Sequence, residues 1–208
     1  LVGLPLDLTP GTHQLATNLG AITFTVEPKQ YLEQRIYLDN DRQVNPQQLD
    51  LERIRGEAHN QREAVAAFRA ANPDLNLILP VEGPISGPFG KRRFFNDQPR
   101  RPHAGTDIAA PLGTPLKAAG AGVITLVGHF FFNGRLVVID HGKGLITMYC
   151  HMDQIAVSEG QVVPKGAIIG TVGATGRVTG PHLHLGMALN GAWIDPALMI
   201  PDIARLPQ

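Results

Sequence analysis

The sequence has little of what would place it in several common classes of protein. It contains one cysteine, Cys150, so no disulfide can form within the chain, and both the cytosol and the cell envelope stay open as compartments. Its 18 Lys and Arg residues balance 18 Asp and Glu residues, which gives a formal net charge of zero. Because a basic excess and a polybasic tract are both missing, we expect no nucleic-acid partner and no attraction to an anionic membrane surface.

Long apolar runs are also missing. Runs such as residues 75–81 are far too short to cross a bilayer, so we expect no stable membrane insertion of this chain. The chain starts at Leu1 rather than at a methionine, and we expect that an N-terminal segment has been removed. Aromatic residues make up only 6 %, whereas 23 glycines and 17 prolines are present. This composition predicts many turns and short strands rather than a helical bundle.

The first 79 residues contain two kinds of segment. Residues 1–45 form a small β domain in this interpretation, because apolar residues and threonines alternate in 22–26 and a second β-type run follows at 35–38. Residues 46–79 then supply a helix and a linker. An Asn-Pro pair starts the helix, and a second Asn-Pro pair stops it, so the helix is expected over 46–71.

Residues 80–208 have the pattern of an antiparallel β domain with long loops that form a groove. Short β-branched runs alternate with glycine-containing turns, and there is no alternation of strands and helices as in parallel nucleotide-binding folds. The whole chain is therefore expected to be mainly β. The expected strands of this segment cover residues 122–127, 136–139, 145–149 and 167–170.

Two histidines occupy alternate positions in one expected strand near the C-terminus. In a strand, His182 and His184 point to the same face, whereas Leu183 and Leu185 point into the core. Two imidazoles on one face indicate a metal or catalytic site. The alternative is a polar edge strand that carries two histidines without a chemical role.

A second pair of metal-ligand residue types lies upstream. His103 and Asp107 are four positions apart in a loop that enters a strand, so both side chains can face one way. Zinc accepts imidazole nitrogen and carboxylate oxygen. This spacing alone is a weak signal, and the alternative is an ordinary loop.

Strand parity also orders residues 149–151. It places Tyr149 and His151 on one face and Cys150 on the other, so Cys150 is expected to be a small buried hydrophobe rather than a ligand or nucleophile. His141, in a glycine-flanked turn, is expected to be structural.

Together these segments resemble the lysostaphin-type (LytM-like) zinc metallopeptidases of bacterial cell walls. The resemblance covers about residues 84–196, and the motifs occur in the order of that family. They are Gly87-Pro88-Phe89-Gly90, His103-x-x-x-Asp107, Ile139-Asp140-His141-Gly142, His151 after Tyr149, Gly173-x-x-Gly176 and Gly180-Pro181-His182-Leu183-His184.

The resemblance implies a zinc site and a pair of catalytic histidines. The metal ligands map to His103, Asp107 and His184, and the catalytic histidines that do not bind metal map to His151 and His182. Three protein ligands leave one zinc position open for water. One histidine then serves as general base and the other stabilises the oxyanion, and the sequence leaves open which is which. Met152 stands where the family commonly has leucine.

The implied activity is hydrolysis of peptide cross-links in peptidoglycan, with its stem peptides as substrate. The D-alanyl–diaminopimelate bond is favoured, because no separate basic wall-targeting domain is seen. Glycyl-glycine endopeptidase activity and a non-catalytic regulator that activates a partner hydrolase are the alternatives. Residues 80–208 are then the peptidase domain, in an exported, periplasmic protein of the bacterial envelope. The N-terminal domain is expected to contact the groove, of which 173–180 forms a wall.

Arginines flank the first of these ligands. We interpret them as part of a solvated loop, and contact with stem-peptide carboxylates is the alternative. They are Arg92, Arg93, Arg100 and Arg101.

Overall fold

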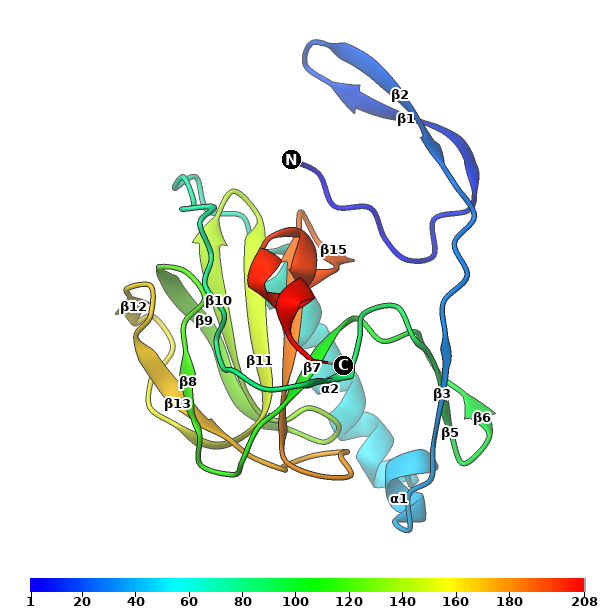
Figure 1. The fold of residues 1–208 in the computed structure, drawn as a ribbon, viewed down its shortest axis with the longest axis vertical. Coiled ribbons are helices and arrows are strands. Elements are labelled where there is room, and N and C mark those ends of the chain that lie inside the picture. The colour runs from blue at the N-terminus through cyan, green and yellow to red at the C-terminus, as the bar shows by residue number, and fades with distance from the viewer. Residues whose placement is uncertain (208) are drawn as a thin grey trace.

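The computed structural model describes residues 1–207, and the protein in it is mainly β (Figure 1). An N-terminal hairpin stands away from the body, and one chain segment leads from it past two helices into a large antiparallel sheet. The N-terminal elements are β1 (Gly11–Thr17), β2 (Gly20–Val26), β3 (Glu33–Ile36), α1 (Asp41–Val44) and α2 (Gln48–Ala66). The remaining strands are β4 (Ile85–Gly87), β5 (Arg92–Phe95), β6 (Gln98–Pro99), β7 (Gly105–Ala109), β8 (Pro115–Lys117), β9 (Gly122–Phe130), β10 (Gly134–Gly142), β11 (Leu145–Ile155), β12 (Val162–Val163), β13 (Ile168–Val172), β14 (His182–Leu189) and β15 (Ala192–Ile194). Two short 3₁₀ helices follow, η1 (Pro196–Leu198) and η2 (Pro201–Arg205).

The large sheet confirms the antiparallel β domain expected from the sequence. Its main path runs β12-β9-β10-β11-β14-β7-β4, and β13, β8 and β15 extend it at the side. Each of the four expected strands of this region is present as β9, β10, β11 or β13, mostly with longer bounds. Glycines make the tight turns: Gly144 follows Lys143 between β10 and β11, and both have positive φ, as a hairpin turn requires.

The two faces of the sheet bury separate hydrophobic cores. One core contains Leu183 and Leu185 of β14 with Tyr149 of β11, as the alternation of β14 predicted. The other face is covered by α2, where Ala64 and Val65 lie in one cluster with the apolar side chains of that sheet face, Phe130, Leu136, Val138, Ile146, Met148, Cys150 and Ala188. Helix α2 therefore forms part of the hydrophobic structure of the sheet domain.

The helix expected over 46–71 is shorter than predicted at both ends. It begins at Gln48, where the Asp50 carboxylate accepts a hydrogen bond from the backbone N–H of Gln47 at 3.1 Å. It ends at Ala66, because the chain then leaves the helix to place Arg69 against β10, where its guanidinium donates to the carbonyl of Asp140 at 2.9 Å. A tertiary contact of this kind ends the helix before the second Asn-Pro pair is reached.

The N-terminal 45 residues are connected to the sheet domain in a way that the sequence did not indicate. Strands β1 and β2 pair with each other, and the strand expected at 22–26 is β2. The second expected strand, 35–38, is β3 at Glu33–Ile36, and it pairs in parallel with β5 of the peptidase region rather than with the hairpin. None of the helices within residues 1–207 combines the length and hydrophobicity needed to cross a membrane.

Candidate metal centre and active site

Three predicted ligands converge at the β7–β14 pair. Asp107 on β7 is the direct register partner of His184 on β14, and His103 lies in the loop that enters β7. His103 Nε2 lies 3.0 Å from Asp107 Oδ1 and 2.9 Å from His184 Nδ1, and His184 Nδ1 lies 2.8 Å from the same carboxylate oxygen. Two imidazole nitrogens and one carboxylate oxygen thus meet at one point, which is a donor set that zinc prefers.

Neighbouring groups fix the orientation of these side chains. His103 donates its Nδ1–H to the carbonyl of Pro88 at 3.0 Å, which leaves Nε2 for the cluster. Arg93 pairs with the second carboxylate oxygen of Asp107, and its Nε donates to the side chain of Gln34 at 3.1 Å. Metal-binding histidines in proteins commonly donate the second ring N–H to a carbonyl or carboxylate in this way.

Two glycines keep space open beside the cluster. A Cβ at Gly105 would lie 2.5 Å from the carbonyl oxygen of Leu185 and 2.7 Å from the ring of His184. A Cβ at Gly87 would lie 2.5 Å from the carboxylate of Asp107. Any side chain at either position would displace a candidate ligand, which explains why glycine occupies both positions.

The electrostatics of the cluster favour the protonation states that bind a metal. Burial opposes ionisation of Asp107, but hydrogen bonds from His103 and His184 outweigh it and hold the pKa of the carboxyl well below its usual range. Burial lowers the pKa of His184 to about 4 although Asp107 acts in the opposite direction. At neutral pH the site therefore presents a carboxylate and a neutral imidazole, as metal coordination requires.

The other two predicted histidines lie beside this cluster. The rings of His151 and His182 have centroids 4.8 Å apart. His151 Nδ1 donates to the carbonyl of Thr175 at 2.8 Å, and His182 Nδ1 donates to the carbonyl of Gly180 at 2.9 Å. His182 Nε2 lies 3.9 Å from Asp107 Oδ1. Both imidazoles thus have Nδ1 engaged by the backbone, which leaves Nε2 available for a reacting group.

The position of His151 shows that the parity prediction for residues 149–151 was wrong. Cys150 lies opposite His184 and Tyr149 lies opposite Leu185, so Cys150 shares the face of the cluster and Tyr149 the opposite face. His151 has a φ of 63°, and its ring centroid lies 6.0 Å from that of His184. A left-handed residue interrupts the alternation of a strand and turns His151 onto the face of the cluster.

The structure confirms that Cys150 and His141 are structural residues. Burial raises the pKa of the Cys150 thiol to about 12, so the thiolate needed for nucleophilic attack is not formed at neutral pH. His141 donates its Nδ1–H to the carbonyl of Ala121 at 2.9 Å, and its Nε2 lies 2.7 Å from the hydroxyl of Thr147. Both ring nitrogens of His141 are thus used inside the core.

The cluster opens into a small pocket that the N-terminal segment helps to close. The pocket has a volume of about 100 Å³ and contains Asp107, His151 and His182. Its remaining lining residues come from β3 and the stretch after it, from β4 and β5, and from the loop before β14: Gln34, Ile36, Leu38, Ser86, Arg93, Phe95, Arg177, Val178 and Thr179. The stretch 173–180 thus supplies part of the wall, as expected.

Sequence reasoning missed two contributors to this pocket. Arg93 was interpreted as part of a solvated loop, but it pairs with a candidate metal ligand. Arg177 was not considered, although an arginine within a glycine-rich stretch was a visible signal. Contact of the N-terminal segment with the groove was expected, but the pairing of β3 with β5 was not, because a pairing over almost 60 positions leaves no local trace in the sequence.

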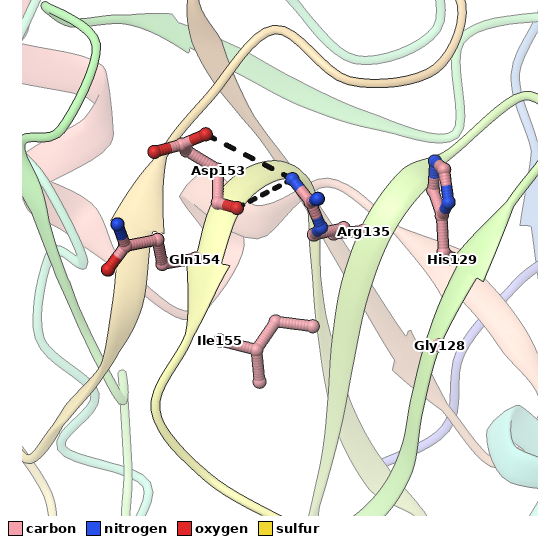
Figure 2. Close-up of a pocket in the computed structure, with 6 residues that line it drawn as sticks. All are labelled: Gly128, His129, Arg135, Asp153, Gln154 and Ile155. Carbon is pink, nitrogen blue, oxygen red and sulfur yellow. Dashed lines mark hydrogen bonds and ion pairs between the residues drawn. The ribbon is translucent and has the colours of Figure 1, made fainter.

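A larger hollow lies elsewhere on the sheet. Figure 2 shows Arg135 extended between Asp153 and His129, and its Nη1 donates to the backbone carbonyl of Asp153 at 2.7 Å. This hollow contains none of the five predicted site residues. Its larger volume, about 520 Å³, therefore does not identify it as the chemical site.

The His-Asp-His cluster with two adjacent histidines, built on an antiparallel sheet, is an arrangement that suits a metal-dependent hydrolase. The model of peptidase family M23 matches residues 101–196, a range that includes all five of these residues. A crystal structure of a candidate M23 peptidase from Pseudomonas aeruginosa is 41 % identical, with a TM-score of 0.78, and the match covers 96 % of this chain and 77 % of that one. The chain therefore belongs to peptidase family M23.

Other relatives share the sheet domain. The peptidoglycan DD-endopeptidase ShyA of Vibrio cholerae is 44 % identical over 126 residues, which are 60 % of this chain and 29 % of that protein. A zinc-containing peptidase from Vibrio cholerae is 34 % identical with a TM-score of 0.54, covering 61 % of this chain and 39 % of that one. The chain spans less than a third of the length of the curated relatives that it matches first.

Proposed function

We propose that this protein is a zinc-dependent endopeptidase that hydrolyses D-alanyl–diaminopimelate cross-links in peptidoglycan. The observation that carries the proposal is the convergence of His103, Asp107 and His184 with His151 and His182, in a chain of family M23. The name of the relative ShyA supports peptidoglycan as the substrate and a DD-bond as its target.

Zinc is the metal that this donor set fits best. Two imidazole nitrogens and one carboxylate are a common protein ligand set for catalytic zinc, and they leave a position open for water or substrate. The zinc-containing relative from Vibrio cholerae agrees with this choice. When bound, zinc would polarise the scissile carbonyl and lower the pKa of a water molecule.

His151 and His182 would handle the proton of the reaction. Burial, together with the neighbouring imidazoles, lowers the pKa of His151 to about 3, so its imidazole is neutral at physiological pH. With Nδ1 held by a backbone carbonyl, each ring can take up, donate or share a proton only at Nε2. We propose that one accepts the proton of water and the other stabilises the oxyanion.

The N-terminal segment would act on the same site. We propose a division into an N-terminal β segment (1–45), a helix and linker (46–79) and a peptidase domain (80–208), with β3 of the first segment restraining the groove of the last. The pocket beneath β3 is smaller than the roughly 300–1,000 Å³ of ordinary ligand sites, so a stem peptide requires β3 to move. Since peptidoglycan lies in the bacterial envelope, we place the protein there, on the periplasmic side.

Digestion of defined muropeptides tests the proposed bond. The zinc-loaded chain is incubated with D-alanyl–diaminopimelate cross-linked dimers and with glycyl-glycine bridged dimers, and product masses are determined. We expect the first to be cleaved to monomers and the second to stay intact. Cleavage of glycyl-glycine bridges alone would identify the other endopeptidase activity. Zinc binding without cleavage of either would instead support the non-catalytic regulator.

A further inference from the structure

A half-buried arginine stands beside the proposed catalytic residues. Arg177 lies in the loop between β13 and β14, and its guanidinium carbon lies 4.2 Å from the ring centroids of both Phe95 and Phe132. Two aromatic rings thus contact the guanidinium by cation–π interactions. Its N–H donors lie in the plane of the guanidinium, and the residue lines the pocket of the proposed active site.

Among the residues that the structure describes, Arg177 is a cation without a carboxylate partner. Burial, with repulsion from Arg93 and Arg100, lowers its pKa to about 10, so it stays charged at neutral pH. Within residues 1–207 no ion pair includes Arg177, and its Nη1 lies 3.5 Å from the carbonyl of Gln43. A partly desolvated charge is unfavourable unless an anion reaches it.

The loop that carries Arg177 is held in place. The backbone N–H of Arg177 donates to the carbonyl of Phe132 at 2.9 Å, and Gln43 donates to the carbonyl of Gly176 at 2.9 Å. Gly176 has a φ of +80°, and a Cβ there would lie 2.4 Å from the backbone nitrogen of Gly134. The guanidinium is thus a fixed group rather than a mobile surface charge, which suits recognition of an anion.

We infer that Arg177 binds the carboxylate of the leaving residue in the substrate, next to the bond that is cut. This inference rests on the proposed function. Arg177 lines the same pocket as Asp107, His151 and His182, so its partner must lie close to the scissile amide. In a D-alanyl–diaminopimelate link, the carbon that bears the scissile nitrogen also bears a free carboxylate. A glycyl-glycine bridge carries no charge there, so Arg177 selects between the two bonds.

The hydrolysis itself leaves this carboxylate unchanged. Water adds its oxygen to the D-alanyl carbonyl carbon, the carbon–nitrogen bond breaks, and the nitrogen leaves with a proton as the diaminopimelate amine. Arg177 is therefore a specificity residue, which positions the leaving residue through a fork of N–H donors that matches a carboxylate.

A pair of substrates tests the inference. One is the D-alanyl–diaminopimelate dimer, and the other has a carboxamide in place of the carboxylate beside the scissile nitrogen. For the zinc-loaded full chain we expect kcat/KM to be about 10- to 100-fold higher for the carboxylate, as for other hydrogen bonds to charged groups. Arg177→Gln should bring this ratio close to one. Arg100→Gln is the control, because it removes a neighbouring guanidinium whose N–H groups already donate to the Val44 carbonyl and the Gln98 side chain. This variant should leave the ratio intact.

The outcomes separate a specificity role from a structural one. If Arg177→Gln lowers both rates equally and keeps the ratio, Arg177 only supports the fold and the inference is overturned. Thermal unfolding shows whether that variant folds, and Arg177→Lys serves as a second variant, which keeps the charge without the planar fork and should retain only part of the ratio.

A binding measurement separates failure of this inference from failure of the proposed function. If the wild-type chain cleaves neither substrate, the proposed function fails. Calorimetry with the amine-side product, a peptide with free diaminopimelate, then decides the inference. The inference is sustained if the product binds the wild type and if replacing its carboxylate by a carboxamide, or Arg177 by Gln, weakens that binding. The inference is overturned if these changes leave binding equal or if the product does not bind.

Discussion

At the scale of single residues, Asp107 connects more of the site than any of its neighbours described above. Its carboxylate lies within hydrogen-bonding distance of His103, His184 and Arg93, although only 6 % of the residue is exposed. We expect Asp107→Ala to weaken zinc binding and to abolish hydrolysis, because it removes one donor oxygen and leaves buried imidazoles and a guanidinium without their anion. Zinc content by elemental analysis and muropeptide turnover measure both effects.

The matched control for this prediction is Asp153→Ala. Asp153 is half-exposed and lies in the hollow of Figure 2, away from the cluster, so zinc content and turnover should stay at the wild-type level. An Asp107→Ala protein with full zinc and full activity would show that the ligand set is wrong.

His151 should behave differently from the ligands. It lies beside the cluster without belonging to the group of converging donor atoms. We therefore expect His151→Ala to retain zinc and to lose turnover by about a hundredfold or more, the usual effect of removing a general acid or base. Equilibrium dialysis with zinc and steady-state kinetics on the same preparation provide the comparison.

His129→Ala is a suitable control, since His129 is an exposed histidine outside the cluster. Loss of zinc in parallel with activity in His151→Ala would mean that His151 is a ligand. The division between binding and catalytic histidines would then have to be redrawn.

At the scale of elements, β3 has the largest consequence for access to the site. It pairs with β5, and Gln34, Ile36 and Leu38 line the pocket of the proposed active site. Outside the pocket, Arg35 and Tyr37 contact the Asp97 carboxylate at 2.8 and 3.0 Å. Alternate side chains of this segment therefore line the pocket, and the side chains between them bind Asp97 in the turn after β5.

Removal of β3 should increase the rate of hydrolysis. A chain of residues 39–208 keeps α2, which covers the second core, whereas a cut at residue 75 would expose Leu136, Val138 and Ile146. At equal zinc loading we expect residues 39–208 to hydrolyse purified peptidoglycan clearly faster than the full chain. The rate of release of soluble muropeptides measures this difference.

A shorter deletion isolates the contribution of the strand. Residues 31–208 lack the β1–β2 hairpin but keep β3, and should retain the rate of the full chain. Thermal unfolding shows whether both shortened chains are folded. Equal or lower rates for a folded 39–208 protein would make β3 a spacer or a wall-binding element rather than a restraint.

At the scale of the whole molecule, a polar network lies inside the apolar sheet. His141 contacts the Thr147 hydroxyl, which lies 3.1 Å from the hydroxyl of Tyr149, and the backbone N–H of Ala119 donates to that same phenol at 2.8 Å. Burial lowers the pKa of His141 from its ordinary value of 6.5, although a hydrogen bond to Ala121 and the charge of Asp140 act in the opposite direction.

This network makes stability depend on pH in a defined direction. Below pH 6.5 the unfolded chain binds a proton at His141 more readily than the folded chain does, so acid lowers the free energy of unfolding; above pH 6.5 the stabilisation is complete. His141→Gln removes this titration. We expect the stability difference between the wild type and His141→Gln to shrink as the pH falls from 7.5 to about 5. Urea unfolding at constant zinc measures it, and a difference independent of pH would contradict the prediction.

The sequence by itself determined the main features of the sheet domain and the identity of the candidate site residues. Alternation in 182–185 is a local property, so the shared face of His182 and His184 and the burial of Leu183 could be predicted without a structure. Glycine-rich turns and β-branched runs likewise indicated most of the strands. The family resemblance then connected His103 and Asp107 to these histidines, which no local pattern could do.

Tertiary structure decided everything that depends on contacts between distant segments. The left-handed backbone at His151 overrode strand parity, the contact of Arg69 with β10 ended α2 early, and β3 paired with β5 rather than with the hairpin. It also placed Arg177 against Phe95 and Phe132. These four features have one physical reason. Local periodicity fixes the direction of a side chain only while a strand or helix continues, and packing between distant segments decides where that strand or helix is interrupted.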